Sequence, residues 1–93
     1  MGTFHDNLGE LHGITVEVET SGGAVHVGRC HEANDQHVLL LDVATHRENE
    51  DGLTNADWLK RAAKWGVFGG EKVMKLPREQ VTNITRLGDV ATR

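Results

Sequence analysis

Residues 28–43 read GRCHEANDQHVLLLDV, and this stretch decides the fold because it divides into a bent strand, a turn and a buried strand. Gly28 lies inside the strand pattern of residues 24–32, where a glycine marks a bulge or a sharp bend. Residues 33–35 (Ala-Asn-Asp) have turn chemistry, since Asn and Asp side chains bond the nearby backbone. Residues 37–44 contain four consecutive aliphatic side chains, which predicts a strand buried on both faces.

The same stretch also carries five side chains that can bind metals: Cys30, His31, Glu32, Asp35 and His37. A metal site or a Cys/His catalytic pair is therefore the alternative interpretation. Neighbouring strand residues point to opposite faces, so Cys30 and His31 cannot both reach one ion from a regular strand. A reactive thiolate also needs electropositive surroundings, which this acidic segment does not supply. We therefore predict no metal ion, no cofactor and no enzymatic activity.

The sequence on the N-terminal side predicts a helix followed by a strand. Residues 4–13 place apolar side chains at helical spacing, and Gly13 can end that helix. Residues 14–20 alternate with period two, which predicts a half-exposed strand with Glu17 and Glu19 on its polar face. The Ser-Gly-Gly turn of residues 21–23 then leads into the strand that contains Gly28.

The C-terminal side predicts one helix and two more strands. After a polar connection (residues 45–51), Thr54 is the expected N-cap of an amphipathic helix over residues 54–65. Residues 72–76 and 81–87 are strand candidates, separated by a turn that begins at Pro77. Five short strands, one of them bent by glycine, predict a mainly β fold: a small antiparallel SH3-like barrel, which leaves few open sheet edges.

The composition is that of one ordinary globular domain, residues 1–93. The chain has a single cysteine, no apolar run of signal-peptide length after Met1 and no segment of about 18 apolar residues, so we expect a cytoplasmic protein outside the membrane. Its net charge of −4 argues against general nucleic-acid affinity. The charge is uneven: residues 1–59 hold two basic and eleven acidic residues, and residues 60–93 hold eight basic and three acidic ones.

Trp58 and Trp65 are the only tryptophans in a chain that is poor in aromatic residues. With Ala62 they share one face of the predicted helix. This face either packs on its own domain or contacts a subunit or partner, where Trp is enriched.

Two segments together resemble the Sm-like proteins, which include bacterial Hfq. LHGITVEV, the SGG turn, VHVGR and NDQHVLLLDVA are similar to the first Sm motif, with Gly28 as its bend and Asp35 as its turn aspartate. VMKLPREQVTNI is similar to the second motif. Lys75 matches the lysine of the Hfq Tyr-Lys-His signature, whereas Met74 and Leu76 stand where its tyrosine and histidine would be. Residues 45–71 correspond to an insertion between the third and fourth strands.

The resemblance implies a homo-oligomeric ring of about five to seven subunits, joined by the fourth strand of one subunit and the fifth of the next. It implies that single-stranded RNA binds on the pore side, near the turn before the third strand and the turn after the fourth. The implied RNA-binding residues are Asp35, Gln36, His37, Lys75 and Arg78. The expected interface residues are Trp58, Trp65, Val73, Met74 and Ile84.

Two functional hypotheses follow. In the first, the protein is an Sm-like ring that binds single-stranded RNA at a repeated site. In the second, it is an SH3-like interaction or assembly module that uses the inserted helix to dock a protein partner and does not bind RNA.

Overall fold

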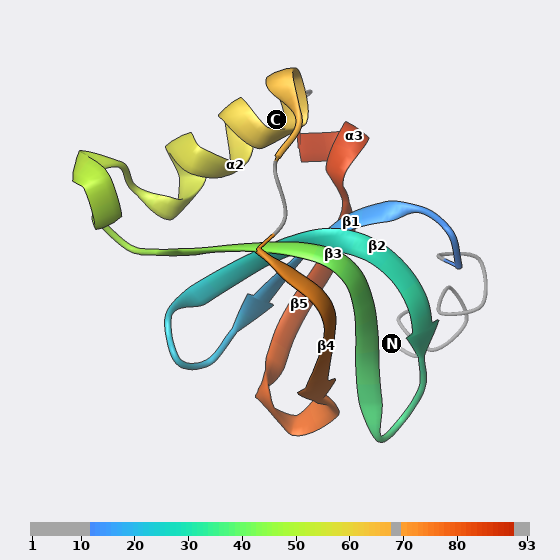
Figure 1. Cartoon of the computed structure of the whole chain (residues 1–93). Coiled ribbons are helices and arrows are strands. Elements are labelled where there is room, and N and C mark those ends of the chain that lie inside the picture. Colours follow the sequence, from blue (N-terminus) through green and yellow to red (C-terminus); the bar gives the residue numbers. More distant parts are fainter. Residues whose placement is uncertain (1–11, 68–69, 91–93) are drawn as a thin grey trace.

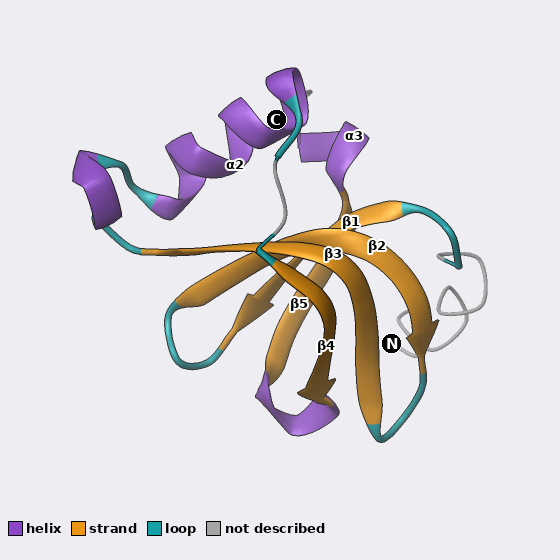
Figure 2. Ribbon diagram, viewed as in Figure 1, coloured by secondary structure: helices purple, strands orange, loops and turns teal. Residues whose placement is uncertain are grey.

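The computed structural model describes residues 12–67 and 70–90. They form an antiparallel sheet in the order β4-β3-β2-β1-β5, with two helices on one side (Figure 1, Figure 2). The strands are β1 (Thr15–Thr20), β2 (Ala24–Ala33), β3 (His37–Arg47), β4 (Glu71–Pro77) and β5 (Val81–Arg86). The helices are α2 (Asn55–Trp65) and α3 (Leu87–Val90), with short 3-10 turns η2 (Glu50–Gly52) and η3 (Arg78–Gln80). The predicted mainly β, five-stranded antiparallel fold is confirmed.

Gly28 marks the bend of β2, as predicted. The register of β2 against β3 shifts between Val27 and Arg29. A Cβ at Gly28 would lie 3.0 Å from the Leu41 carbonyl oxygen and 3.1 Å from Val43 Cγ2. Only a residue without a Cβ allows the two strands to approach this closely, so the bend depends on glycine.

The bent sheet separates two apolar cores. The inner core is enclosed by the sheet and contains Val16, Val18, Cys30, Val38, Leu40, Val43, Leu76 and Val81. The outer core lies between the sheet and the two helices and contains Val25, Val27, Leu59, Ala62, Leu87 and Val90. Each strand points alternate residues to opposite faces, so β2 is buried on both sides along much of its length.

The helix α2 forms where the sequence predicts it. The Oγ1 of Thr54 accepts a hydrogen bond from the Asp57 backbone N–H at 3.1 Å, which caps the first turn. Gly66 ends the helix with a φ of 82°, a conformation that favours glycine. Leu59 and Ala62 are buried in the outer core.

The structure corrects three expectations about β1 and β3. Glu17, expected on a solvent-exposed face, is fully buried, because it pairs with Val27 on the face that the helices cover. Residues 45–47, expected in a connection, continue β3. Leu39 and Leu41 are partly exposed, so only alternate residues of the apolar run face the inner core.

At the chain ends, the expected strand of residues 81–87 stops at Arg86, and Leu87 instead begins the helix α3, which the sequence did not predict. The predicted helix of residues 4–13 lies almost entirely outside the described residues. No helix of the described ranges combines the length and apolar character that crossing a bilayer requires.

Candidate functional site

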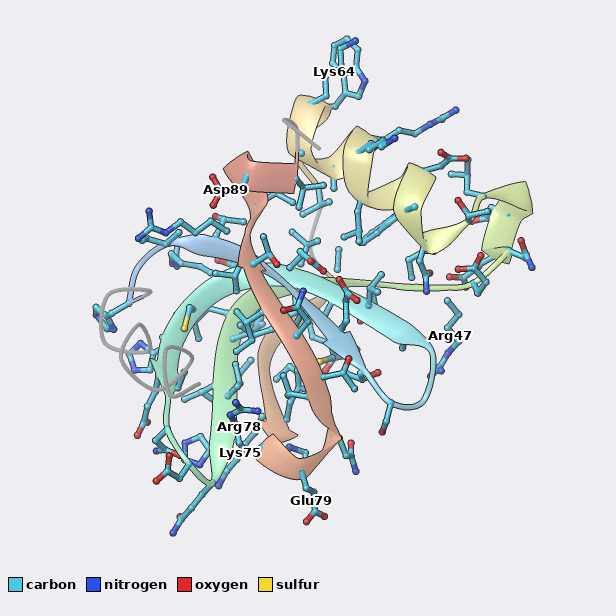
Figure 3. The ribbon with its side chains drawn as sticks, turned by 180° about the vertical axis from the view of Figure 1, so that it is seen from behind. Arg47, Lys64, Lys75, Arg78, Glu79 and Asp89 are labelled. Carbon is cyan, nitrogen blue, oxygen red and sulfur yellow. The ribbon has the colours of Figure 1, made fainter. Side chains whose placement is uncertain are left out.

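The turn before β3 and the turn after β4 lie against each other. The backbone N–H of Arg78 donates a hydrogen bond to the carbonyl oxygen of Gln36 at 2.9 Å. In the β3–β4 ladder, His37 pairs with Pro77. The antiparallel pairing of β3 with β4 therefore brings Arg78 next to Gln36 and His37, which lie far from it in the sequence. Figure 3 shows Lys75 and Arg78 at this end of the molecule.

Asn34 fixes the conformation of the first of these turns. Its Oδ1 accepts hydrogen bonds from the backbone N–H groups of Gln36 at 2.8 Å and His37 at 2.9 Å. Its backbone N–H donates to the His37 carbonyl oxygen at 3.0 Å. An Asn side chain that bonds the backbone two and three residues ahead holds a tight turn. Sequence reasoning identified Asn34 as a turn residue but not as the residue that positions Gln36 and His37.

A small surface hollow lies where the two turns meet. Its volume is about 260 Å³, and it is lined by Gln36, His37, Lys75 and Pro77; we call it the turn pocket. Gln36 and Lys75 are exposed, and His37 is half-buried. Four side chains that can offer an amide, an imidazole, an ammonium group and an apolar ring thus surround one hollow. Three of the five predicted RNA-binding residues line this hollow. A fourth, Arg78, is next to it, because its backbone N–H donates to the carbonyl oxygen of Gln36.

The charges around the turn pocket are mixed. His37 Nε2 lies 3.6 Å from Glu32 Oε1, and the Asn34 side-chain amide donates to Glu32 Oε2 at 3.2 Å. Asp35 is exposed in the same turn, and Arg78 is half-buried in η3. Two cations, Lys75 and Arg78, therefore stand near two carboxylates. An anionic ligand would meet both attraction and repulsion here, and salt would screen both.

Two larger hollows lie elsewhere, between α2 and the sheet, with volumes of about 440 and 360 Å³. Both are lined by Gly66 and Val67 and by mostly small or apolar side chains. The charged residues of the second hollow, Arg29 and Asp42, already pair with each other at 3.4 Å. The first hollow has fewer polar side chains than the turn pocket, and in the second only Thr15 adds a polar side chain outside this pair.

The inserted segment is attached to the sheet through His46, which is buried. Its Nδ1 lies 2.8 Å from Asn55 Oδ1, and its Nε2 lies 3.0 Å from the Glu50 carbonyl oxygen. The Asn55 side-chain amide donates to the Gly23 carbonyl oxygen at 2.9 Å. The His46 ring stacks on Trp58 with 5.1 Å between ring centroids. These contacts hold η2 and the start of α2 against β3 and the β1–β2 turn.

The two tryptophans occupy different environments. Trp58 is half-buried, packs against the outer core and stacks on His46. Trp65 retains 76% of its surface in solvent. The sequence placed both on one helical face, but the buried stripe of α2 runs through Leu59 and Ala62, and Trp65 extends beyond it at the last helical position.

The remaining expected interface residues lie on the two edge strands of the sheet. Val73, on β4, is 55% exposed. Met74, also on β4, and Ile84, on β5, are partly buried and pack against the inner core. Of these three side chains, only Val73 is presented mainly to solvent.

Cys30 and His31 point to opposite faces of β2, as the strand geometry predicts. Cys30 lies in the inner core and His31 is exposed. Burial raises the pKa of the Cys30 thiol, which disfavours the nucleophilic thiolate. Over residues 12–67 and 70–90, no three His, Cys, Asp or Glu side chains converge on a possible metal position.

No protein-family model and no curated protein matches this chain. Several solved structures do match it. An Sm-like archaeal protein from Pyrobaculum aerophilum superposes with a TM-score of 0.60 at 18% identity, covering 89% of this chain and 50% of that one. The fold is Sm-like. A chain from the NatC complex bound to CoA superposes with a TM-score of 0.59 at 16% identity, covering 90% of this chain and 88% of that chain.

The chain thus spans half the length of the Sm-like archaeal protein. At these identities the similarity establishes the Sm-like fold, and the five strands follow one another in the predicted order. The helix α2 lies between the third and fourth strands of this fold.

Proposed function

We propose that this chain is a ring-forming Sm-like subunit that binds single-stranded RNA at the turn pocket, as a binding protein without catalytic activity. The observation that supports this most directly is the hydrogen bond from Arg78 N–H to the Gln36 carbonyl oxygen, which joins the two turns. It places Gln36, His37 and Lys75 around one hollow. These are residues that the Sm-like resemblance independently associates with RNA.

Ring assembly is proposed through the two edge strands. Within the described chain, β4 pairs only with β3 and β5 only with β1. An edge strand presents unpaired backbone groups, which favours pairing with another strand. Pairing β4 of one subunit with β5 of the next is a head-to-tail contact, and such contacts close into a ring when the rotation allows it. Val73, Met74 and Ile84 lie on these strands.

The chemistry of the turn pocket suits a base and its phosphate. The ring of His37 offers a face on which a base can stack, and the Gln36 amide can both donate to and accept from a base edge. Lys75 and Arg78 can contact phosphate oxygens. One such site is weak, but repetition around a ring raises the effective concentration of each further contact.

The proposal is tested with fluorescently labelled U-rich and A-rich oligonucleotides and the purified particle. We expect binding that weakens as salt rises, and a clearly lower affinity in the Lys75→Ala, Arg78→Ala double variant than in the wild type. The matched control is Lys72→Ala, which removes an exposed lysine from the same strand. Circular dichroism would verify that each variant is folded. Failure of the assembled protein to bind any oligonucleotide at low salt would refute the proposal.

A second candidate function is a small-barrel assembly module without RNA binding. It is favoured by the similarity to a chain from the NatC complex and by the 55% exposure of Val73 on β4. The mass of the native particle and its absorbance ratio at 260 and 280 nm distinguish the two. A five- to seven-subunit particle that carries nucleic acid supports the first candidate. A particle free of nucleic acid that also binds no oligonucleotide supports the second.

A further inference from the structure

The solvent face of α2 gathers three cations and one aromatic ring. Lys60, Arg61, Lys64 and Trp65 are all exposed, whereas the apolar side of the helix is buried in the outer core. Positions three and four apart lie on the same side of a helix, so these residues form one surface; we call it the α2 basic face. Figure 3 shows Lys64 at the end of α2, directed away from the sheet.

None of the three cations is neutralised within the described chain. Lys60, Arg61 and Lys64 form no ion pair with any residue in the ranges 12–67 and 70–90. The Lys64 ammonium instead lies 5.2 Å from the centre of the Trp65 ring, a cation–π contact. With 76% of its surface in solvent, Trp65 still offers ring surface to a ligand.

These features fit a nucleic acid better than a protein or a membrane. The cores of protein interfaces are depleted of lysine, and here one aromatic ring shares its face of the helix with three cations, of which Lys64 contacts the ring. A membrane-bound helix needs a broad apolar face, but Leu59 and Ala62 are already buried. Single-stranded nucleic acids are bound by cations along the backbone together with aromatic rings on which bases stack.

We propose that the α2 basic face is a binding surface for single-stranded nucleic acid, with Trp65 stacking on a base while Lys60, Arg61 and Lys64 contact phosphates. This surface is separate from the turn pocket. α2 and η3 lie at opposite ends of a molecule whose longest extent is 34 Å (Figure 1). The inference shares a ligand class with the proposed function but does not depend on the turn pocket.

Trp65 provides a direct spectroscopic test. In a Trp58→Phe protein, Trp65 is the only tryptophan, so its fluorescence reports on the α2 basic face alone. We expect single-stranded oligonucleotides to quench this fluorescence. Three phosphate contacts predict a slope of about −2 for the logarithm of the binding constant against the logarithm of the salt concentration. Lys60→Ala with Lys64→Ala should reduce that slope by about 1.4.

Further variants separate this surface from the turn pocket. In the Trp58→Phe background, the Lys75→Ala, Arg78→Ala protein should still show quenching of Trp65, even if its turn pocket no longer binds. Trp65→Ala in that background should weaken oligonucleotide binding by about tenfold or more. Lys72→Ala, the control, should leave quenching unchanged. Asp57→Asn, which removes the carboxylate at the start of α2, should strengthen binding.

Three results would overturn the proposal. The first is the absence of quenching with every oligonucleotide at low salt. The second is quenching that the Lys60→Ala, Lys64→Ala variant does not alter. The third is a change in particle mass in the Trp65→Ala protein with oligonucleotide binding unaffected, which would assign this face to a contact between proteins.

Discussion

Gly28→Ala tests whether steric exclusion at one position sets the bend of the barrel. The added Cβ would lie 3.0 Å from the Leu41 carbonyl oxygen, 3.1 Å from Val43 Cγ2 and 3.4 Å from Leu40 Cβ. The closest of these atoms belongs to the backbone of β3, which cannot move without disturbing the ladder. Overpacking of this kind typically costs about 2 kcal/mol.

Gly22→Ala is the matched control. A Cβ at Gly22 meets nothing within 4 Å, and its φ is not in the left-handed region. Both substitutions reduce the conformational entropy of the unfolded chain to the same extent, by about 0.4–1 kcal/mol. The difference between the two variants therefore reports the steric cost at Gly28. For a domain of this size, about 2 kcal/mol lowers the midpoint of thermal unfolding by about 10 °C.

The assay is urea and thermal unfolding followed by circular dichroism. Protein concentration must be the same for both variants, because subunit association adds apparent stability. We expect Gly22→Ala to match or slightly exceed the wild type and Gly28→Ala to unfold well below it. Equal unfolding midpoints for the two variants would refute the steric argument for the bend.

Three further predictions follow from single side chains. Thr54→Ala should lower the free energy of unfolding by about 1 kcal/mol in urea titrations, since it removes the cap of α2. Thr54→Ser, which keeps the hydroxyl group, should have a free energy of unfolding close to that of the wild type. Burial, with a smaller effect of Arg47, lowers the pKa of His26, so at mildly acidic pH the unfolded state binds a proton that the folded state does not. The free energy of unfolding, measured in urea titrations, should therefore fall as the pH drops through about 6.5. The fall should be smaller in the His26→Gln variant. Cys30 should react with thiol reagents much more slowly in the folded protein than in urea, and equal rates would contradict its place in the inner core.

Local chemistry made much of the fold predictable. The cap at Thr54, the helix end at Gly66 and the bend at Gly28 were each identified from residue type and position, and each has the expected geometry. The alternation over residues 14–20 correctly predicted β1. These features depend on neighbours in the sequence or on backbone sterics, which the residue types report directly.

The error at Glu17 came from the second apolar layer. Glu17 was expected in solvent because period two distinguishes one face of a strand from the other but does not show what covers each face. The outer core is formed by α2 and α3, and α3 is a single short turn with no sequence pattern of its own. The burial of His46 has the same origin, since its partners are the Glu50 carbonyl oxygen and the side chains of Asn55 and Trp58.

The sequence by itself determined where the strands and α2 lie, apart from the C-terminal ends of β3 and β5, because hydrophobic period, glycine and capping residues act over a few positions. The tertiary structure alone decided which of those segments meet. The pairing of His37 with Pro77 sets the register of β3 against β4, and that register places Gln36 and Lys75 around one hollow. Packing of α2 through Leu59 likewise decided that Trp58 is half-buried and Trp65 is exposed. Register and docking depend on contacts between residues far apart in the chain, which a local pattern does not encode.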